Sequence, residues 1–418
     1  MRLLRNSQIV PVLMFHSVGP QRPNWLFSQL ADSVACFEGT LKGLSDAGFR
    51  TLTLEELYRH MSAREKIPGH AVVLTFDDGY LDNWVYAVPL LRKYGMRATV
   101  YVTPEFVDES DTVRPVHEDL ATARRESADE APSGFMNWAE LNAAQSEGVL
   151  DIQSHSLTHT WYFSGPRCLD FHRPRRPDPY PWLAWNARPA RKPFYMAEDQ
   201  QSFVPWGHPV FEHEKSLVAR KFEPEPGPVN EITEWVADNG GAEFFGQPQW
   251  RADLESRFGF LRGAGSIPGR RESDEAYRER IFAELSASRT ILEERLDKHV
   301  RYVAWPGGGN SGAVVEAAKK AGYLSWTLSS RQEPEKRNIP GSDPSGIKRI
   351  SGSGNSQWQG RQVGFDESWW VVRRTLSHQG DAWSRTRIRL RKLIRFGQSL
   401  LRERFANKDV DAGGGTNL

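Results

Sequence analysis

Short apolar runs alternate with stretches of helical periodicity along the first 160 residues. The apolar runs are rich in β-branched residues, as strands are, and lie at residues 9–18, 71–76, 97–103 and 149–156. Apolar positions three to four residues apart predict helices between them, at residues 37–47, 81–95 and 137–148. The run at 71–76 is almost continuously apolar, which indicates a parallel strand covered on both faces.

The same alternation returns near the end of the chain. Residues 273–300 predict a long amphipathic helix with Ser273 as its N-terminal cap, and residues 301–330 predict a strand, a helix and a strand. Strands joined by helices of this length form βα units around a parallel sheet. An open sheet and a closed barrel both fit this pattern.

The alternation stops between Trp161 and Gly269. Residues 161–213 contain nine prolines and twelve aromatic residues, a composition too aromatic for a disordered linker. We interpret residues 161–274 as an ordered, irregular insertion that covers a site on the main fold. Residues 119–134 are charged and small, and we expect a solvated loop there.

The C-terminal tail, residues 365–418, is basic. Its segment 381–404 contains eight Arg or Lys against two acids, and one apolar face at helical spacing is formed by Leu390, Leu393, Ile394, Leu400 and Leu401. Two interpretations stay open: a surface helix docked on the body, or a basic amphipathic helix lying on an anionic membrane. No nucleic-acid motif accompanies the charge, so no nucleic-acid partner is expected.

Composition limits the class and the compartment. The 418 residues are 39% hydrophobic and 26% charged, with a net charge of +1, which is ordinary for a globular protein whose core needs no disulfide. Cys36 and Cys168 are expected to be reduced thiols. The apolar run at 9–15 is too short for a signal-peptide core or a membrane span. We therefore expect a cytoplasmic protein, with a peripheral place at the inner face of the membrane left open.

Two adjacent carboxylates, Asp77 and Asp78, follow the apolar run at 71–76. Active sites of α/β folds gather at the carboxyl ends of parallel strands, and two like charges there raise each other's pKa unless a cation lies beside them. The competing interpretation is a helix cap, because a helix is predicted to begin near Leu81. The aspartate pair alone does not decide between the two.

Two histidines with H-x-x-x-H spacing, His155 and His159, follow another predicted strand. On a helical turn both imidazoles would point the same way and could share a metal ion. With one carboxylate of the aspartate pair they make a two-histidine, one-carboxylate site, which leaves positions open for water and substrate. One aspartate would bind the metal while its neighbour accepts a proton from water.

A glycine-rich turn, "AWPGGGNSG" at 304–312, follows the strand predicted near residue 302. Its glycines let a ligand come close to backbone N–H groups. Two interpretations stay open: an edge that stabilises an oxyanion, or a tight strand-to-helix turn. A phosphate loop is not expected, because the Lys-Ser/Thr pair of such loops is missing.

The motifs "TFDDGY", "SHSLTH" and a Pro-Gly strand end, in this order, resemble those of the NodB-type polysaccharide deacetylases, a family of carbohydrate esterases. The stretches "PVLMFHSV" and "GFRTLTLEEL" are similar to the PgaB-like branch of that family. The resemblance covers residues 8–160 and 275–350. It implies an α/β fold, an irregular (β/α) barrel of NodB-homology type, interrupted here by the insertion and followed by the basic helix. It also implies metal-dependent removal of acetyl groups from sugars.

The resemblance implies a role for each motif residue. Asp77 would be the general base, and a divalent transition metal, expected to be Zn²⁺, would be bound by Asp78, His155 and His159. The oxyanion would be held in part by the N–H of Gly307, and the residues implied in contact with the oxyanion or substrate are Tyr80, Trp305, Pro306 and Gly307.

Two departures from the family pattern leave roles open. No histidine matches the family's late catalytic acid, since His378 lies in the basic tail; His16 corresponds to the first-strand histidine of the PgaB-like branch, and we expect it to protonate the leaving amine. Many relatives have an arginine two residues before the motif proline that orients the catalytic aspartate, but Ala304 stands there in this chain. Either another cation orients Asp77, or the pKa of Asp77 is tuned differently.

These residues favour a metal-dependent deacetylase that hydrolyses the acetamide of an N-acetylated sugar. The substrate would be a polysaccharide or a glycan precursor, such as a lipid- or nucleotide-linked one. A catalytically inactive glycan-binding or assembly protein and a hydrolase of small non-sugar amides are the alternatives. His208 and His213 lack metal-site spacing, and the insertion's candidates for stacking on sugar rings are Trp161, Tyr162, Trp182, Trp185 and Trp206.

Overall fold

The structure is a computed structural model that describes residues 8–412 apart from residues 64, 66, 68, 118–124, 126, 260–264 and 329–336, with side chains described as far as Ser399. The loop predicted at 119–134 and the end of the strand–helix–strand segment predicted at 301–330 fall partly outside these residues. No helix among the described residues is both long and apolar enough to cross a lipid bilayer.

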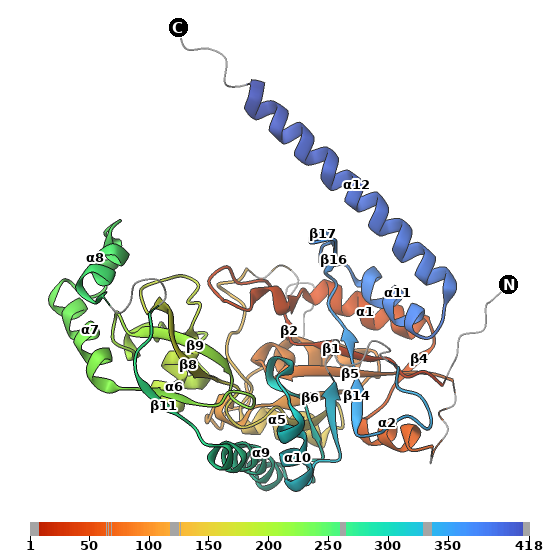
Figure 1. Cartoon of the computed structure of the whole chain (residues 1–418). Coiled ribbons are helices and arrows are strands. Elements are labelled where there is room, and N and C mark those ends of the chain that lie inside the picture. Colours follow the sequence, from red (N-terminus) through yellow and green to blue (C-terminus); the bar gives the residue numbers. More distant parts are fainter. Residues whose placement is uncertain are drawn as a thin grey trace.

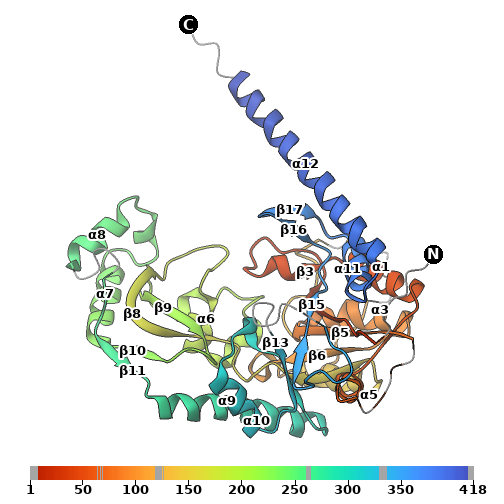
Figure 2. The same cartoon turned by 45° about the vertical axis from the view of Figure 1, so that its right-hand side comes forward.

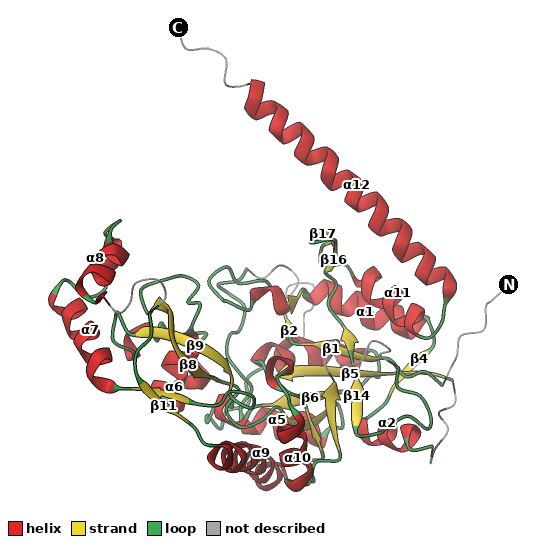
Figure 3. Ribbon diagram, viewed as in Figure 1, coloured by secondary structure: helices red, strands yellow, loops and turns green. Residues whose placement is uncertain are grey.

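A barrel of parallel strands forms the centre of the molecule (Figures 1 and 3). The hydrogen-bonded order of its strands is β14-β13-β12-β7-β6-β5-β1-β15, and β4 (Phe49–Thr51) pairs with β5 outside this order. The bounds of these strands are Val12–Phe15 (β1), His70–Asp78 (β5), Ala98–Val102 (β6), Leu150–Ser154 (β7), Tyr302–Val303 (β12), Ser325–Leu328 (β13), Gly346–Lys348 (β14) and Ile350–Ser351 (β15).

The barrel closes through one segment of chain. β14 and β15, at the two ends of the strand order, are separated only by Arg349. β14 pairs with β13, and β15 pairs with β1. The segment 346–351 therefore joins both edges of the sheet, which leaves no open edge at this point. The predicted irregular (β/α) barrel is confirmed, and the open sheet is excluded.

Helices surround the barrel. They are α1 (Val34–Asp46), α2 (Leu54–Met61), a π-helical turn (Asn83–Ala87) leading into α3 (Val88–Lys93), α5 (Trp138–Ser146), α9 (Asp274–Leu296) and α10 (Gly312–Lys320). Local sequence sets their starts, because side chains at the caps accept hydrogen bonds from first-turn N–H groups. Ser273 caps α9 as predicted, and Asn137 forms a capping box with Glu140 at α5.

Strand β5 shows why its sequence is almost entirely apolar. Alternate side chains of a strand point to opposite faces. Val72, Leu74 and Phe76 pack with residues of α1 in the main apolar core. Ala71 and Val73 pack with residues of the other barrel strands in a second, smaller core. Both faces of the strand are therefore buried, as predicted.

The insertion forms a unit beside the barrel (Figures 1 and 2). Its centre is an antiparallel pair, β8 (Trp161–Phe171) with β9 (Pro209–Lys215), and a second pair joins β10 (Phe222–Pro224) to β11 (Gly269–Arg271). The helices of this unit are α6 (Pro181–Ala187), α7 (Pro226–Asp238) and α8 (Trp250–Arg257). An apolar cluster of its own lies between β8, β9, α7 and α8, so the aromatic composition corresponds to an ordered, packed unit.

The C-terminal part returns to the barrel and then leaves it. A short hairpin, β16 (Ser356–Trp358) and β17 (Arg361–Gly364), precedes α11 (Ser368–His378). Helix α11 packs on α1, with Val372 against Gly43, and α12 (Ala382–Ala412) then projects away from the body (Figures 1 and 2). Both cysteines are buried and unbridged, as expected.

Candidate active site

Asp77 is buried inside the barrel because of its place in the strand. It lies on the same face of β5 as Ala71 and Val73, which line the barrel interior, and it is 3% exposed. A charged carboxylate at such a depth requires a partner. The helix-cap interpretation of this residue is therefore wrong.

That partner is Arg349, which the sequence did not identify. Its guanidinium donates two hydrogen bonds to Asp77, from Nη1 to Oδ1 at 2.6 Å and from Nη2 to Oδ2 at 2.8 Å. Both side chains are buried. Arg349 lies between β14 and β15, where the barrel closes. It also supplies the positive charge beside Asp77 that an alanine at position 304 cannot provide.

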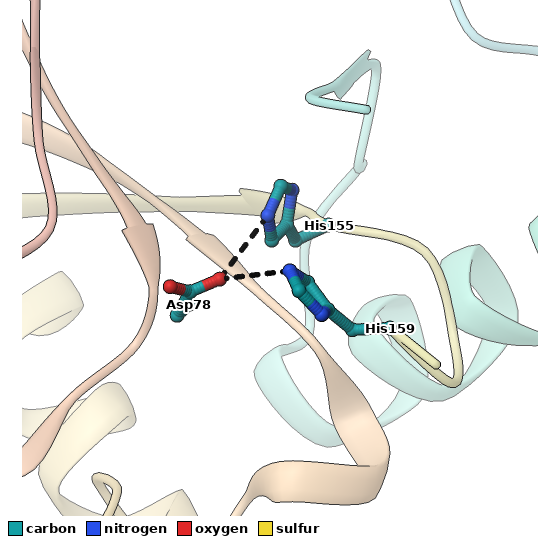
Figure 4. Close-up of side chains that lie close together, drawn as sticks. All are labelled: Asp78, His155 and His159. Carbon is teal, nitrogen blue, oxygen red and sulfur yellow. Dashed lines mark ion pairs between the residues drawn. The ribbon is translucent and has the colours of Figure 1, made fainter. Parts of the chain in front are cut away.

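Asp78 turns away from the strand toward the two histidines (Figure 4). Its backbone φ is +77°, an uncommon value for a residue other than glycine, and this ends the alternation of β5. Its Oδ1 lies 3.2 Å from Nε2 of His155 and 3.2 Å from Nε2 of His159. The carboxylate and both imidazoles therefore converge on one point.

The two histidines do not lie on a helical turn, which corrects the sequence-based interpretation of their spacing. Residues 155–159 form a loop after β7, and both Ser156 (φ +62°) and His159 (φ +40°) have left-handed backbones. This turn brings the His159 ring to 5.0 Å from the His155 ring. Local strain of this kind is common at functional sites, where the surrounding structure holds it in place.

The donor set of Asp78, His155 and His159 fits a divalent transition metal. The ligand atoms lie within 4.8 Å of one another. Ligands about 2.0–2.1 Å from a tetrahedral Zn²⁺ lie about 3.3 Å apart, close to the separations of the Asp78 oxygen from the two ring nitrogens. His155 Nδ1 lies 2.9 Å from the carbonyl oxygen of Ala304, which accepts a hydrogen bond and leaves Nε2 free as a ligand.

The electrostatics of the site keep both carboxylates ionised. Burial raises the pKa of Asp77, but the Arg349 guanidinium, with His155 and His16, outweighs this effect, and the pKa lies below its ordinary value. Burial likewise raises the pKa of Asp78, but hydrogen bonds from His155 and His159 hold it well below the ordinary value. Asp77 and Asp78 can therefore both be ionised although they are adjacent, because each carboxylate faces its own positive or hydrogen-bonding partners.

His16 lies at the end of β1, beside the base. Its Nε2 is 3.9 Å from Asp77 Oδ2, and its side chain is 17% exposed. Burial lowers the pKa of His16, although Asp77 and Asp78 act in the opposite direction. His378, the other histidine considered for the acid, ends α11 on the outer surface of α1 and lies apart from this group.

Tyr80 forms a hydrogen bond with Asp78. It is 4% exposed, and burial together with its hydrogen bond to Asp78 raises its pKa well above the ordinary value. Tyr195 of the insertion hydrogen-bonds Tyr80 and accepts a hydrogen bond from Trp25 Nε1 at 3.1 Å. Tyr80 is therefore a donor that orients Asp78.

The third motif forms a tight turn at the same end of the barrel. Pro306 is buried, Gly307 is exposed with φ +54°, and Gly308 N–H donates to the Trp305 carbonyl at 2.9 Å. Trp305 is 1% exposed and packs in the main core, which corrects the predicted contact of its side chain with substrate. It supports the turn that presents Gly307.

The insertion reaches the site through the hairpin β8–β9. Trp161 and Lys215 are cross-strand partners, so their side chains lie on the same face of this hairpin. The Trp161 ring is 5.8 Å from the His159 ring, and a Cβ atom on Gly307 would lie 2.5 Å from Lys215 Cε. Lys215 is half-buried and makes no ion pair within the described part of the chain.

The other aromatic candidates of the insertion have structural contacts. Trp182 and Trp185 are buried at 4% and 2% exposure. Trp206 stacks on His172, and Tyr162 lies beneath Lys221. Among the five predicted stacking residues, Trp161 is the one whose ring contacts a residue of the Asp–His–His group.

Arg349 could have been found from one signal. The sequence "GIKRIS" at 346–351 places two basic residues, Lys348 and Arg349, between Ile347 and Ile350, so one of them would face the barrel interior if the segment were a strand. The segment is short and follows a stretch with no clear periodicity, so its pairing with both β13 and β1 was not predictable. Lys215 carries no comparable sequence signal.

The fold and the site define a class: a parallel (β/α) barrel whose strand ends hold an arginine-paired aspartate next to an Asp–His–His group. Residues 64–176, which contain this aspartate pair and both histidines, match the family model described as polysaccharide deacetylase. The resemblance read from the motifs is thereby confirmed for this segment.

The chain is similar to a curated relative and to several solved structures. The "Putative polysaccharide deacetylase YxkH" of Bacillus subtilis (strain 168) is 38% identical over 93 residues, which are 22% of this chain and 31% of that protein, so the match spans about a third of the relative's length. Solved structures with similarity include a de-N-acetylase from Aggregatibacter actinomycetemcomitans (16% identity, TM-score 0.47, 82% of this chain and 94% of that chain). Another is the BpsB deacetylase domain from Bordetella bronchiseptica (16% identity, TM-score 0.47, 83% and 97%).

Proposed function

We propose that this protein is a metal-dependent deacetylase that hydrolyses the acetamide of an N-acetylated sugar. One observation carries the proposal: an ionised carboxylate, Asp77, is held by Arg349 directly beside a three-ligand group that fits a transition metal. A base next to an open metal position is the arrangement that hydrolysis of an unactivated amide requires. The family match of residues 64–176 agrees with this chemistry.

A divalent metal held by Asp78, His155 and His159 would supply a Lewis acid and lower the pKa of water at the site. Asp77 would accept the proton of the attacking water at its carboxylate, which Arg349 keeps ionised and oriented. His16 would donate a proton to the departing amine, since its Nε2 lies 3.9 Å from Asp77 Oδ2, beside the base. The N–H of Gly307 would donate to the oxyanion of the tetrahedral intermediate.

The hairpin of the insertion supports a sugar substrate. Trp161 presents a partly exposed ring beside His159, and aromatic faces of this kind bind the apolar faces of sugar rings. Lys215, the cross-strand partner of Trp161, adds a cation against Gly307 that makes no ion pair with the residues the structure describes. A cation at this position favours a glycan that carries a negative charge near its acetamido group, such as a phosphate-linked precursor, over a neutral polymer.

Acetate release from N-acetylhexosamine compounds tests the proposal. The substrates are a neutral oligosaccharide, a sugar nucleotide and a small cyclic amide, and bound metal is quantified by elemental analysis. Asp77→Asn and His155→Ala should abolish acetate release while the fold, checked by circular dichroism, is kept. Asp111→Asn and His299→Ala are matched controls on exposed positions and should behave as the wild type.

The outcomes separate the proposal from its alternatives. Full activity of folded Asp77→Asn and His155→Ala would overturn the mechanism. Glycan binding without acetate release by the metal-loaded wild type would indicate an inactive binding protein. Release from the cyclic amide alone would indicate a hydrolase of small amides.

A further inference from the structure

The C-terminal helix α12 touches the body through one side only. Arg391 and Arg395 form ion pairs with Glu367, the latter from Nη2 to Oε1 at 3.1 Å. The ring of Phe396 lies 5.3 Å from the ring of Trp358 on the β16–β17 hairpin. These contacts hold the first half of the helix, and the remainder projects away from the barrel (Figures 1 and 2).

The apolar face of α12 points away from the body. Its four large side chains are more than half exposed: Trp383 (62%), Leu390 (56%), Leu393 (57%) and Ile394 (52%). At 3.6 residues per turn, these positions span a stripe about 100° wide, and Phe396 and Arg395 lie outside that stripe. The first half of the helix is docked on the body, as one of the two interpretations predicted, but through Arg391, Arg395 and Phe396, whereas Leu390 and Leu393 stay exposed. The side chains of Leu400 and Leu401 lie outside the described residues.

Positive charge flanks the stripe. Between Ala382 and Ser399 the helix has no acidic residue, and its basic residues are Arg385, Arg387, Arg389, Arg391, Lys392 and Arg395. Glu367 pairs with two of these, and Arg387 lies over the Trp383 ring at 6.0 Å from its centroid. Exposed apolar residues this close together mark an interaction site.

We propose that this outer face of α12, defined by Trp383, Arg387, Leu390, Leu393 and Ile394, binds the surface of an anionic lipid membrane. Apolar side chains can enter the boundary between headgroups and acyl chains while the flanking arginines contact anionic headgroups. Tryptophan favours the same boundary, because its ring is apolar and its N–H is polar.

The same features argue against other partners. A second copy of the chain packed on this stripe would bring two rows of arginines together without acids to neutralise them. A nucleic acid would be bound by the arginines but would leave four large apolar side chains in water. An anionic bilayer satisfies both the charge and the apolar stripe.

Flotation of the full-length protein with lipid vesicles tests the inference. Vesicles of phosphatidylcholine alone are compared with vesicles that also contain phosphatidylglycerol. The wild type should float with the anionic vesicles, and raised salt should release a large part of it. The triple variant Leu390→Asn, Leu393→Asn, Ile394→Asn should bind at least about tenfold more weakly.

Two further variants keep the test decisive. Val113→Asn with Leu324→Asn removes exposed apolar side chains elsewhere (47% and 38% exposed) and should bind as the wild type does. Arg387→Gln with Arg389→Gln should lower binding to anionic vesicles by about fivefold for each arginine removed, since each cation near such a surface contributes about 1 kcal/mol. This variant keeps the apolar stripe, so it still measures the contribution of the arginines to membrane binding if the triple variant does not fold.

Three results would overturn the inference. The first is wild-type flotation that does not depend on the anionic lipid. The second is a triple variant that floats as well as the wild type. The third is self-association of the wild type in sedimentation velocity that the same triple variant abolishes, since the stripe would then be an interface between copies of the chain. Deacetylase activity on a soluble substrate should stay unchanged in all these variants, so a failure here leaves the proposed function untouched.

Discussion

Replacing Arg349 by methionine separates its electrostatic role from its structural one. The change removes the guanidinium that binds Asp77 at 2.6 and 2.8 Å and keeps a side chain of similar length at the barrel closure. Both partners are nearly buried, at 9% and 5% exposure of their side chains. Removing one partner of a buried ion pair costs about 3–5 kcal/mol, because the remaining charge has lost its compensation.

The sign of the pH dependence follows from the pKa of Asp77. In the wild type this pKa lies below its ordinary value of 3.8, so the pair contributes stability above that pH and loses it as the pH falls through the folded-state pKa. In Arg349→Met the burial of Asp77 is opposed only by His155 and His16, and its pKa rises. The difference in the free energy of unfolding should therefore be largest at neutral pH and shrink toward acid.

Two assays measure these effects. Urea unfolding at several pH values gives the free energy of unfolding, and the pH profile of kcat/KM gives the ionisation of the base. The acid limb of that profile should move to higher pH, and the activity at neutral pH should fall by about 10²-fold or more. The double variant Arg349→Met, Asp77→Asn should recover much of the stability without recovering activity, because no buried charge remains unpaired.

A matched control breaks another arginine pair away from the site. Arg280→Met removes two hydrogen bonds to Glu272, of 2.8 and 2.9 Å, between largely buried side chains. It should lower stability and leave the acid limb in place. If Arg349→Met likewise lowers only stability, with the acid limb unmoved, then Arg349 does not control the ionisation of Asp77 and the reasoning about this pair fails.

Four other changes test separate parts of the molecule. Burial raises the pKa of Asp32 from 3.8 to about 7, so the free energy of unfolding should fall by about 4 kcal/mol as the pH rises through this range. Asp32→Asn keeps an acceptor for the Gly354 N–H, and in urea unfolding between pH 4 and 7 it should flatten this pH dependence. His16→Asn should lower kcat by about 10²-fold with little change in KM; unchanged kcat would remove His16 as the acid. Trp161→Ala should raise KM for an N-acetylated oligosaccharide, by about 1–2 kcal/mol of lost contact, while an effect on kcat alone would contradict ring stacking. Chelation should lower the Tm and abolish acetate release in the wild type, with Zn²⁺ restoring both, whereas the Tm of His155→Ala should not respond to the chelator.

Most of the barrel and much of its site could be predicted from local sequence. Helix caps such as Ser273 and the continuous apolar run of β5 act within a few residues, so their structural meaning does not depend on the rest of the chain. The same holds for Asp77 and Asp78, because a strand end places both at the rim of a parallel sheet. The spacing of His155 and His159 indicated a shared ligand site, although the local backbone is a strained loop and not a helical turn.

The rest depended on contacts between distant segments. Periodicity states which residues are buried but not which strand edges meet, so the closure through 346–351 and the partner of Asp77 appear only when the chain is folded. The same limit applies to the amphipathic tail, whose apolar face is evident from helical spacing while its direction, away from the body, is set by Glu367 and Trp358. The sequence alone determined the aspartates and histidines of the site, since each lies in a short motif at the end of a strand. Only the tertiary structure decided that Arg349 completes the site, because Asp77, its partner, is 272 residues away along the chain.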